Sequence, residues 1–305
     1  MGSYIIKRIA VGIVTIFLVA TITFFLMYLV PGGPFLSEKS PSKQTIEALE
    51  RKYGLDKPVY IQYLNYMKGL IKFDLGPSLK MRGREVVDII KTRFPISAKL
   101  GGLAMLLAIC IGIPMGIFSA INRGKWFDNI VMVICTFGIA VPGFVVATVL
   151  MYFFGVTLHI LPTRGLDSPA HYILPVTALA FYPTAYISRL MRSSMLDVLG
   201  QDYMRTAKAK GLSQFKSLFK HALRNAVLPI ITYLGPALAY ILTGSLVVEK
   251  IFTIPGLGRQ FVSSITDRDY PLIMGLTIFL AFLLITMNVI VDIVYKIIDP
   301  RIKLK

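Results

Sequence analysis

The sequence has few of the residues that build disulfide frameworks, metal centres and hydrolytic active sites. It contains two cysteines and three histidines among 305 residues. Cys110 and Cys135 both lie in apolar segments without metal-ligand spacing, so we expect neither a disulfide framework nor a metal site. The histidines are far apart and none belongs to a His-Glu-x-x-His motif, which disfavours an intramembrane metalloprotease.

A loop that could bind nucleotide phosphates is also missing. The Gly-x-x-x-x-Gly-Lys-[Ser/Thr] motif does not occur, and the only Gly-Lys pair, Gly124-Lys125, is followed by Trp126. No serine or lysine stands in a recognisable nucleophile motif, which leaves an intramembrane serine enzyme as a weak alternative. We therefore expect that the chain is not an enzyme and that it holds no cofactor of its own.

Acidic residues are half as frequent as basic ones. The chain has 16 Asp and Glu against 33 Lys and Arg, which gives a net charge of +17. A strongly basic chain often binds nucleic acid. Here the basic residues are spread over the polar stretches between apolar segments instead of one compact domain, so no nucleic-acid partner is expected.

Apolar residues, by contrast, make up 55% of the chain, above the share of a typical soluble domain. A helix needs about 20 apolar residues to cross a bilayer. Six segments reach that length, near residues 10–30, 100–120, 129–155, 172–191, 226–248 and 271–295. We therefore predict an all-α polytopic membrane protein with six transmembrane helices, the first of which is too long for a signal peptide. Its partner would be the lipid bilayer.

The ionisable residues within these segments are Arg189 and Asp292, and both lie near a segment end. A proton-coupled carrier is expected to bury acids or histidines at mid-membrane. The pattern therefore disfavours a standalone secondary carrier or channel, which stays open as the less favoured class. We divide the chain into a first segment (1–30), an extracytoplasmic helical region (31–98) and a core domain (99–305).

The distribution of Lys and Arg over the short loops predicts the orientation. With the N-terminus inside, the inner stretches 1–9, 121–128, 189–225 and 296–305 hold 2, 2, 8 and 4 of these residues, and the two short outer loops hold 1 and 3. Basic residues favour the cytoplasmic side of short loops. We therefore predict that both termini are cytoplasmic.

One basic stretch, from Asp202 to Pro229, interrupts the apolar pattern. Asp202 is a candidate N-cap for a helix over 203–210, and Gly211 a candidate C-terminal cap. Ser213 can cap a second helix. The apolar residues of that helix recur at helical spacing, opposite a basic stripe. The apolar set comprises Phe215, Leu218, Phe219, Ala222 and Leu223, and the basic stripe comprises Lys216, Lys220 and Arg224.

This stretch resembles the "EAA" loop of membrane permeases in ATP-driven importers. The matching residues are Thr206, Ala207, Ala209, Gly211, Asn225, Leu228 and Pro229. The glutamate of the family pattern is replaced, since Met204 or Arg205 stands in its place with Asp202 nearby. The resemblance implies that the loop 203–224 couples the permease to an ATPase. The implied coupling residues are Asp202, Arg205, Thr206, Ala207, Ala209, Gly211, Leu212, Phe215 and Phe219.

Six further stretches are similar to the first membrane subunit of oligopeptide, dipeptide and nickel importers. They lie at 32–35, 53–58, 74–78, 248–258, 268–271 and 299–301. The resemblance implies a prokaryotic cell-membrane complex with a second homologous permease subunit, two cytoplasmic ATPase subunits that bind ATP and Mg, and an external solute-binding protein. We interpret the chain as a permease subunit for oligopeptides or dipeptides. A nickel or other small-solute importer remains the alternative.

The region 36–98 is predicted to be folded. Ser42 can cap a helix that ends at Tyr53, a second helix starts near Pro58, and a third covers 84–94. The second carries Tyr60, Leu64, Met67 and Ile71 at helical spacing. Whether these helices pack on the transmembrane helices or dock a partner stays open.

Proline and glycine at membrane depth perturb helices, as expected of helices that line a moving aqueous path. The residues predicted to face this path are Pro142, Tyr182, Thr232, Tyr240, Thr243 and Ser245. By resemblance, the stretch around 254–258 helps to close the outer mouth. The residues assigned to that gate, on the side of the binding protein, are Glu249, Pro255, Gly256, Gly258 and Asp269.

Overall fold

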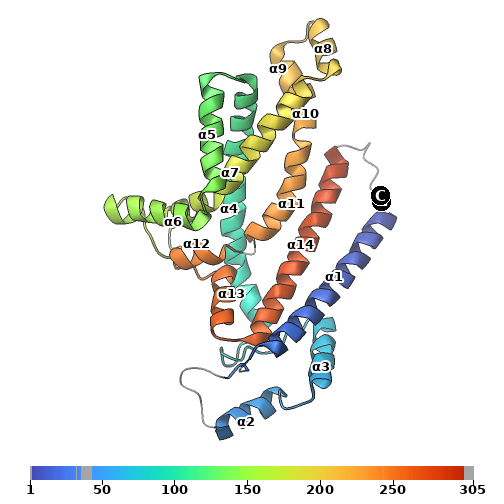
Figure 1. Cartoon of the computed structure of the whole chain (residues 1–305), viewed down its shortest axis with the longest axis vertical. Helices are drawn as coiled ribbons and strands as arrows, with labels where there is room; N and C mark the ends of the chain where they lie inside the picture. Colours follow the sequence, from blue (N-terminus) through green and yellow to red (C-terminus); the bar gives the residue numbers. More distant parts are fainter. Residues whose placement is uncertain (1, 32, 36–42, 243, 299–305) are drawn as a thin grey trace.

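The computed structural model describes residues 2–31, 33–35, 43–242 and 244–298. Within these ranges the regular structure is helical, apart from one isolated bridge between Pro77 and Glu85. The prediction of an all-α chain is therefore confirmed (Figure 1). In chain order the elements are α1 (Gly2–Leu29), α2 (Lys43–Tyr53), α3 (Val59–Ile71), α4 (Val86–Ile121), α5 (Trp126–Ala140), α6 (Gly143–Leu150), the π-helix η1 (Met151–Thr157), α7 (Ala170–Leu199), α8 (Asp202–Ala209), α9 (Gln214–Lys216), the π-helix η2 (Ser217–Ala222), α10 (Leu223–Ala226), α11 (Leu228–Leu242), α12 (Leu246–Ile251), α13 (Leu257–Thr266) and α14 (Tyr270–Ile298).

Several helices are long and apolar enough to cross a membrane. They are α1, α4, the α11–α12 pair and α14, and α5 with α6 and η1 forms a further candidate whose two parts meet at 103°. The predicted fourth segment, 172–191, belongs to α7, a helix of 30 residues that is not among these apolar spans. Length and composition of the described residues thus support four or five spans, and six only if α7 is counted with them.

The predicted third segment, 129–155, is not one straight helix. It breaks at Val141 and Pro142, between α5 and α6. Val141 adopts an extended backbone with φ −82° and ψ 123°, which is the conformation that a following proline favours. Pro142 also has no N–H to continue the ladder of helical hydrogen bonds. The prolyl peptide therefore turns the chain, and α6 leaves the bundle sideways (Figure 1).

The predicted outer helix 84–94 and the predicted second segment 100–120 are one helix, contrary to the separate elements expected. α4 runs for 36 residues and passes through Pro95 and Pro114. Ser97 and Leu100, in the turn after Pro95, are 0% and 1% exposed. Tertiary packing of this turn outweighs the loss of one helical hydrogen bond, because buried contacts routinely override local propensity.

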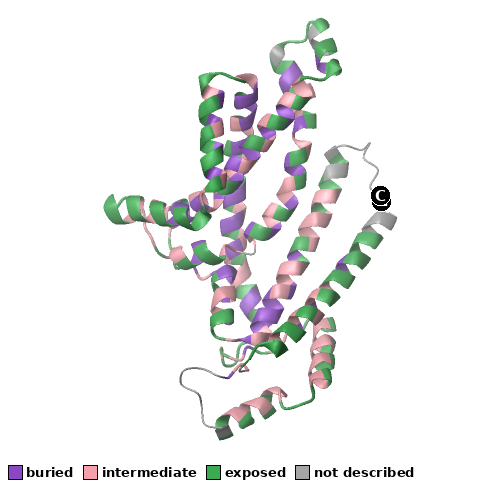
Figure 2. Cartoon of the chain, viewed as in Figure 1, coloured by how far each residue is buried: buried purple, intermediate pink, exposed green. Residues whose placement is uncertain are grey.

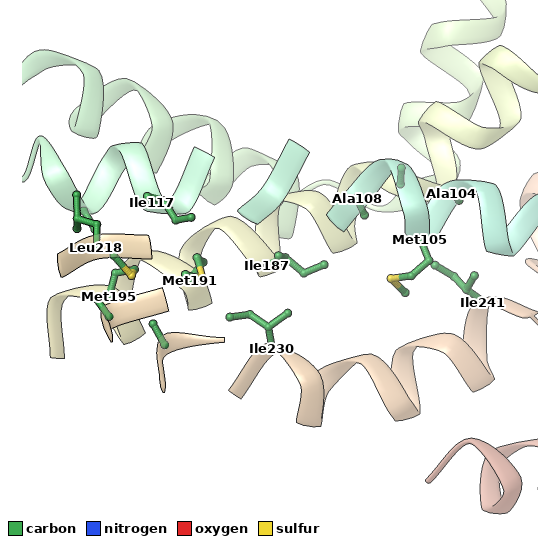
Figure 3. Close-up of a cluster of buried hydrophobic side chains, with 14 of the residues drawn as sticks. Ala104, Met105, Ala108, Ile117, Ile187, Met191, Met195, Leu218, Ile230 and Ile241 are labelled. Carbon is green, nitrogen blue, oxygen red and sulfur yellow. The ribbon is translucent and has the colours of Figure 1, made fainter. Parts of the chain in front are cut away.

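The core lies between α4, α7 and α11 (Figures 2 and 3). α4 and α7 approach closely because small residues face α7. A Cβ atom added at Gly112 would lie 2.9 Å from the Ile187 side chain, and one at Gly116 would lie 2.6 Å from the Ser188 carbonyl oxygen. Ile187 and Met191 of α7 lie between the α4 and α11 ribbons in Figure 3. The two helices therefore form the closely packed centre of the described chain.

α1 lies along α14 at the edge of the bundle, and most of its described side chains are exposed (Figure 2). Arg8 and Asp292 form an ion pair of 3.0 Å between these helices. α3 packs on the other end of α1, where the rings of Phe24 and Tyr66 stack at 5.8 Å. Burial raises the pKa of the Tyr66 hydroxyl above its usual value. The α8 unit lies at one end of the molecule and α2 at the other, which we call the α8 end and the α2 end (Figure 1).

Candidate functional site

A small helical unit, α8 to α10, protrudes from the end of α7 (Figure 1). Met204 of α8 is 1% exposed and belongs to the same buried cluster as Met195 of α7 and Leu218 of η2. The side-chain amide of Asn225 in α10 donates a hydrogen bond of 2.9 Å to the Tyr203 hydroxyl in α8. The unit therefore packs on itself and shares a buried cluster with α7.

The structure distinguishes between the two caps predicted for α8. Gly211 has φ +75°, and no atom lies within 4 Å of where its Cβ would be, so the left-handed backbone is what requires glycine. Asp202 is not the N-cap, because α8 begins at Asp202 and the Gln201 carbonyl accepts the first bond, from the Met204 N–H at 3.0 Å. The Asp202 carboxylate instead lies 3.6 Å from Arg205 in an exposed ion pair.

The predicted apolar stripe of the second helix divides into two faces. Leu218 and Ala222 are buried at 8% and 0% exposed, whereas Phe215 and Phe219 are 70% and 46% exposed. The two exposed rings lie against each other, with centroids 4.4 Å apart. The division follows from η2, because a π-helix has more residues per turn and shifts the register of the stripe. The result is an exposed aromatic pair beside basic residues.

The other residues predicted for coupling lie on the surface of the same unit. Arg205, Thr206, Ala209 and Leu212 are exposed. Ala207 lies in α8, outside the side chains that the structure describes. Together with the aromatic pair, these positions form a surface that no part of the described chain covers, as expected of a docking site for another protein.

A cavity of about 610 Å³ lies where the α5–α6 bend meets α7, α11 and α12. Four of the six predicted path residues line it: Pro142, Tyr182, Tyr240 and Ser245. They come from segments that are far apart in the sequence. The structure therefore brings together residues that were predicted only from their neighbourhood to proline and glycine, although their role in transport stays a prediction.

The wall of this cavity is mainly apolar, with four aromatic side chains and no charged side chain among its lining residues. Tyr186 stacks between Tyr182, at 6.1 Å, and Tyr233, at 4.4 Å, so rings of α7 and α11 form one continuous stack. Tyr182 and Tyr233 both line the cavity. Such a wall offers apolar surface and a few hydroxyl groups.

One predicted path residue among those that the structure describes does not belong to this wall. Thr232 is exposed on α11, where its hydroxyl donates to the Leu228 carbonyl oxygen at 3.2 Å, and it does not line the cavity. It lies two turns from Tyr240 along α11 and is therefore closer to the α8 end. Thr243 lies outside the described residues.

Near the C-terminal end of α12, away from Ser245, the buried carboxylate of Glu249 caps the N-terminus of α13. Glu249 is 0% exposed, and one of its oxygens accepts the Ser97 hydroxyl at 2.6 Å. The other oxygen accepts the Arg259 N–H at 3.0 Å, while the Ser97 oxygen accepts the Leu257 N–H at 2.7 Å. Leu257 and Arg259 belong to the first turn of α13, whose free N–H groups and dipole favour a negative charge. Glu249 therefore joins α12, α4 and α13.

Glycines make room for this carboxylate. A Cβ at Gly244 or Gly256 would collide with the Glu249 side chain, and one at Gly258 would lie 3.0 Å from the Gly244 carbonyl. The Pro255 carbonyl accepts a bond of 3.1 Å from Arg93 of α4. These predicted gate residues thus connect α4, α12 and α13 inside the protein. Glu249 offers no surface to an external protein.

Asp269, the fifth predicted gate residue, is also buried, at 1% exposed. Its carboxylate accepts bonds from the Ser78 hydroxyl and from the Leu79 N–H, the latter at 3.1 Å. The neighbouring Arg268 donates to the Pro31 carbonyl at 3.0 Å. Arg268 also donates to the Gly33 carbonyl at 3.5 Å. The contact of Ser78 with Asp269 therefore joins the stretches 74–78 and 268–271, and Arg268 joins the latter to Gly33 of the stretch 32–35.

Sequence reasoning missed one buried ion pair near the α8 end. Arg192 of α7 binds Asp128 of α5 through two bonds of 2.6 and 2.7 Å, and Asp128 is 2% exposed. The Ser119 hydroxyl and the Gly124 N–H also donate to this carboxylate. The sequence does contain an indication of this ion pair, because Asp128 is a lone acid in the first turn of an apolar helix. The pair joins α5 to α7.

The comparisons with known proteins agree with this arrangement. Residues 112–304 match the family described as binding-protein-dependent transport system inner membrane component, and residues 1–101 match the N-terminal family of the same membrane components. The chain is 48% identical, over 100% of its length and 99% of the relative's, to a dipeptide transport system permease protein, DppB, of Bacillus subtilis. It is 44% identical, over 99% of its length and 100% of the relative's, to an oligopeptide transport system permease protein, OppB, of Haemophilus influenzae.

A solved structure supports the fold. The chain resembles a chain of the MetNI methionine ABC transporter in inward-facing conformations, with a TM-score of 0.56 and 15% identity over 70% of this chain and 97% of that one. The family implies that an ATPase and a binding protein are partners. The chain belongs to the inner membrane components of binding-protein-dependent transport systems, and it is a multi-pass permease subunit of a bacterial ABC importer, not its ATPase.

Proposed function

We propose that this permease forms one half of the path by which a bacterial importer takes up dipeptides or oligopeptides. A second, homologous permease subunit would form the other half and close the cavity. The observation that carries the proposal is the 610 Å³ cavity itself, which combines aromatic surface with hydroxyl groups between the α5–α6 bend, α7 and α11. The names of the relatives from Bacillus and Haemophilus point to the same class of solute.

The chemistry of the cavity favours peptides over nickel. Its lining residues include no histidine, cysteine, aspartate or glutamate, and the described residues contain no group of three such side chains that could hold a metal ion. Nickel would call for such ligands along its route. A wall without fixed charge instead passes peptides with different side chains, so selectivity is left to the binding protein.

Coupling to ATP hydrolysis is assigned to the α8–α10 unit. We propose that two cytoplasmic ATPase subunits bind ATP and Mg, and that one of them docks on the surface around Phe215 and Phe219. Closure of the ATPases would displace this unit. Because Met204 and Leu218 share one buried cluster with Met195 of α7, the displacement would tilt α7 and α4 and change which side the cavity faces.

The orientation follows from the same assignment. The α8 unit and both chain ends would be cytoplasmic, and the region 31–98 external, in agreement with the charges of the short loops. α2 lies farthest from the bundle at its end of the molecule (Figure 2), and it exposes the face that carries Glu47, Ala48 and Arg51. It is our candidate to receive the binding protein, while the Glu249 and Asp269 contacts hold the outer gate.

Reconstitution tests the proposal. The two permeases and two ATPases are placed in liposomes with the cognate binding protein, and ATP hydrolysis and solute uptake are measured together. Peptides should stimulate hydrolysis and accumulate inside, and the effect should require the binding protein. Uptake of free nickel without any response to peptides would contradict the substrate, while leaving the assignment as a permease unchanged.

A further inference from the structure

The apolar stripe predicted on α3 is only partly covered by the described chain. Tyr60, Leu64 and Ile71 are 65%, 51% and 78% exposed, and Phe73, just after the helix, is 85% exposed. A water-facing surface rarely keeps a row of large apolar side chains without a partner. We therefore expect something other than the described part of this chain to cover the exposed row.

Contacts with α1 place α3 at the edge of the membrane layer. The Tyr63 hydroxyl lies 2.8 Å from the Thr21 hydroxyl, and its ring packs on Phe24 and Phe25 with centroids 5.4 and 5.5 Å apart. Thr21 lies eight residues before Leu29, where α1 and its apolar span end. At 1.5 Å per residue that is about 12 Å along the helix axis, so the middle of α3 lies beside the last turns of the span.

Contacts with α14 place the end of α3 at a similar depth. The turn after α3 folds back, because a Cβ at Gly69 would lie 2.8 Å from the Asp74 carbonyl oxygen. The next residue, Leu75, lies 3.2 Å from where a Cβ of Gly275 would be. Gly275 is five residues inside the span that begins at Tyr270, or about 7 Å along the axis.

The local sequence and backbone fit a lipid environment. Phe73 has φ +58°, a left-handed conformation that is unfavourable for a bulky residue, and its ring gains almost no contact within the chain. Lys68 and Lys72 are exposed on either side of Ile71. Large apolar side chains next to lysines are typical of helices at the boundary between headgroups and acyl chains.

We propose that the C-terminal end of α3, with Ile71 and Phe73, is seated in the lipid leaflet at the α2 end, at the boundary of headgroups and acyl chains. The segment is then a membrane anchor of the region 31–98 and holds α2 at a fixed height above the bilayer. The proposal rests on the membrane placement of α1 and α14 and does not depend on the transported solute.

Tryptophan fluorescence in the complete importer, reconstituted in lipid nanodiscs, tests this proposal. Trp126, the only native tryptophan, is replaced by phenylalanine, and Phe73→Trp or Ile71→Trp is introduced. Ala48→Trp on the exposed surface of α2 is the matched control, because α2 lies farther from the bundle than α3 (Figure 1). Lipids brominated near the glycerol end of the acyl chain should quench Phe73→Trp and Ile71→Trp more than lipids brominated at the chain end. Before the binding protein is added, the control should respond to aqueous acrylamide and to neither lipid.

Three results would overturn the proposal. Quenching of Phe73→Trp and Ile71→Trp by acrylamide to the same extent as Ala48→Trp, without lipid quenching, would place α3 in water. Protection from both quenchers without the binding protein would mean that another subunit covers the segment. Protection from acrylamide that develops only when the binding protein is added would make α3 part of its docking site. None of these readings depends on transport activity.

Discussion

Phe219→Ser removes one ring of the exposed aromatic pair on the α8–α10 unit. Phe219 is 46% exposed, so the isolated permease loses about half of a full side-chain burial, which is about 1 kcal/mol of stability. Truncation of an aromatic anchor at the centre of an interface costs about 2 kcal/mol or more, which corresponds to a loss of affinity of about 30-fold. We therefore expect Phe219→Ser to weaken ATPase binding by about this factor while the permease remains folded.

The neighbouring ring provides an internal check. Phe215 and Phe219 lie 4.4 Å apart, so they contribute jointly to any interface. The loss of affinity for the double substitution should therefore differ from the sum of the single losses, by about 0.5–1.5 kcal/mol, the range measured for coupled aromatic pairs. Two rings that act independently would give additive losses instead.

Two neighbours on the same unit serve as controls in a titration of purified ATPase onto the permease in nanodiscs. Leu218 is buried, so Leu218→Ala should lower the stability of the permease by about 2–5 kcal/mol, visible in its thermal unfolding. Lys216 is exposed, so Lys216→Ala should change mainly the salt dependence of association. Unchanged ATPase affinity and unchanged stimulated hydrolysis in Phe219→Ser would refute the docking of the aromatic pair.

Three further substitutions test other contacts. Gly211→Ala should destabilise the turn after α8 by about 1 kcal/mol, because its φ of +75° disfavours a side chain, and it should lower stimulated ATP hydrolysis more than Gly200→Ala, whose φ is −77°. Asp128→Asn leaves a half-buried arginine without its ion pair and should lower the thermal stability of the complex by about 2–4 kcal/mol. Gly244→Ala combines a φ of +91° with a collision at the buried carboxylate, so its complex should fail to assemble in size-exclusion chromatography, whereas Gly102→Ala, in open space, should assemble normally.

Proline illustrates what the sequence could and could not predict about the fold. Both Pro142 and Pro95 are helix breakers by local chemistry. The chain turns at Pro142, where Val141 is extended and a Cβ at Gly143 would meet no neighbour within 4 Å. It continues through Pro95, because Ser97 is fully buried against α12 and α13. Only tertiary contacts separate the two cases.

The candidate sites show the same division between local and distant effects. Gly211 could be assigned to a left-handed position because the requirement is local, and the structure agrees. The contact between Asp269 and Ser78 spans 191 residues, and the sequence around either residue does not indicate that the two are in contact. The exposure of Phe219 could not be predicted either, since the stripe implied one buried face and the π-helix η2 rotates this residue outward.

Water access to the cavity in different nucleotide states would test most directly whether it is part of a moving path. Tyr240 lines the cavity and is 79% exposed, whereas its neighbour Ala239 is 1% exposed on the other side of α11. Tyr240→Cys and Ala239→Cys are prepared in a background in which Cys110 and Cys135 are replaced by serine and alanine. Each is treated with a membrane-impermeant thiol reagent in the complete importer, without nucleotide and with ATP trapped in the ATPases.

We expect Tyr240→Cys to react in at least one state and its rate to change between the two states, because closure of the ATPases should turn the cavity toward the other side of the membrane. Ala239→Cys should stay unreactive in both, since it remains packed between helices. Complete protection of Tyr240→Cys in every nucleotide state would contradict a hydrated path along this wall.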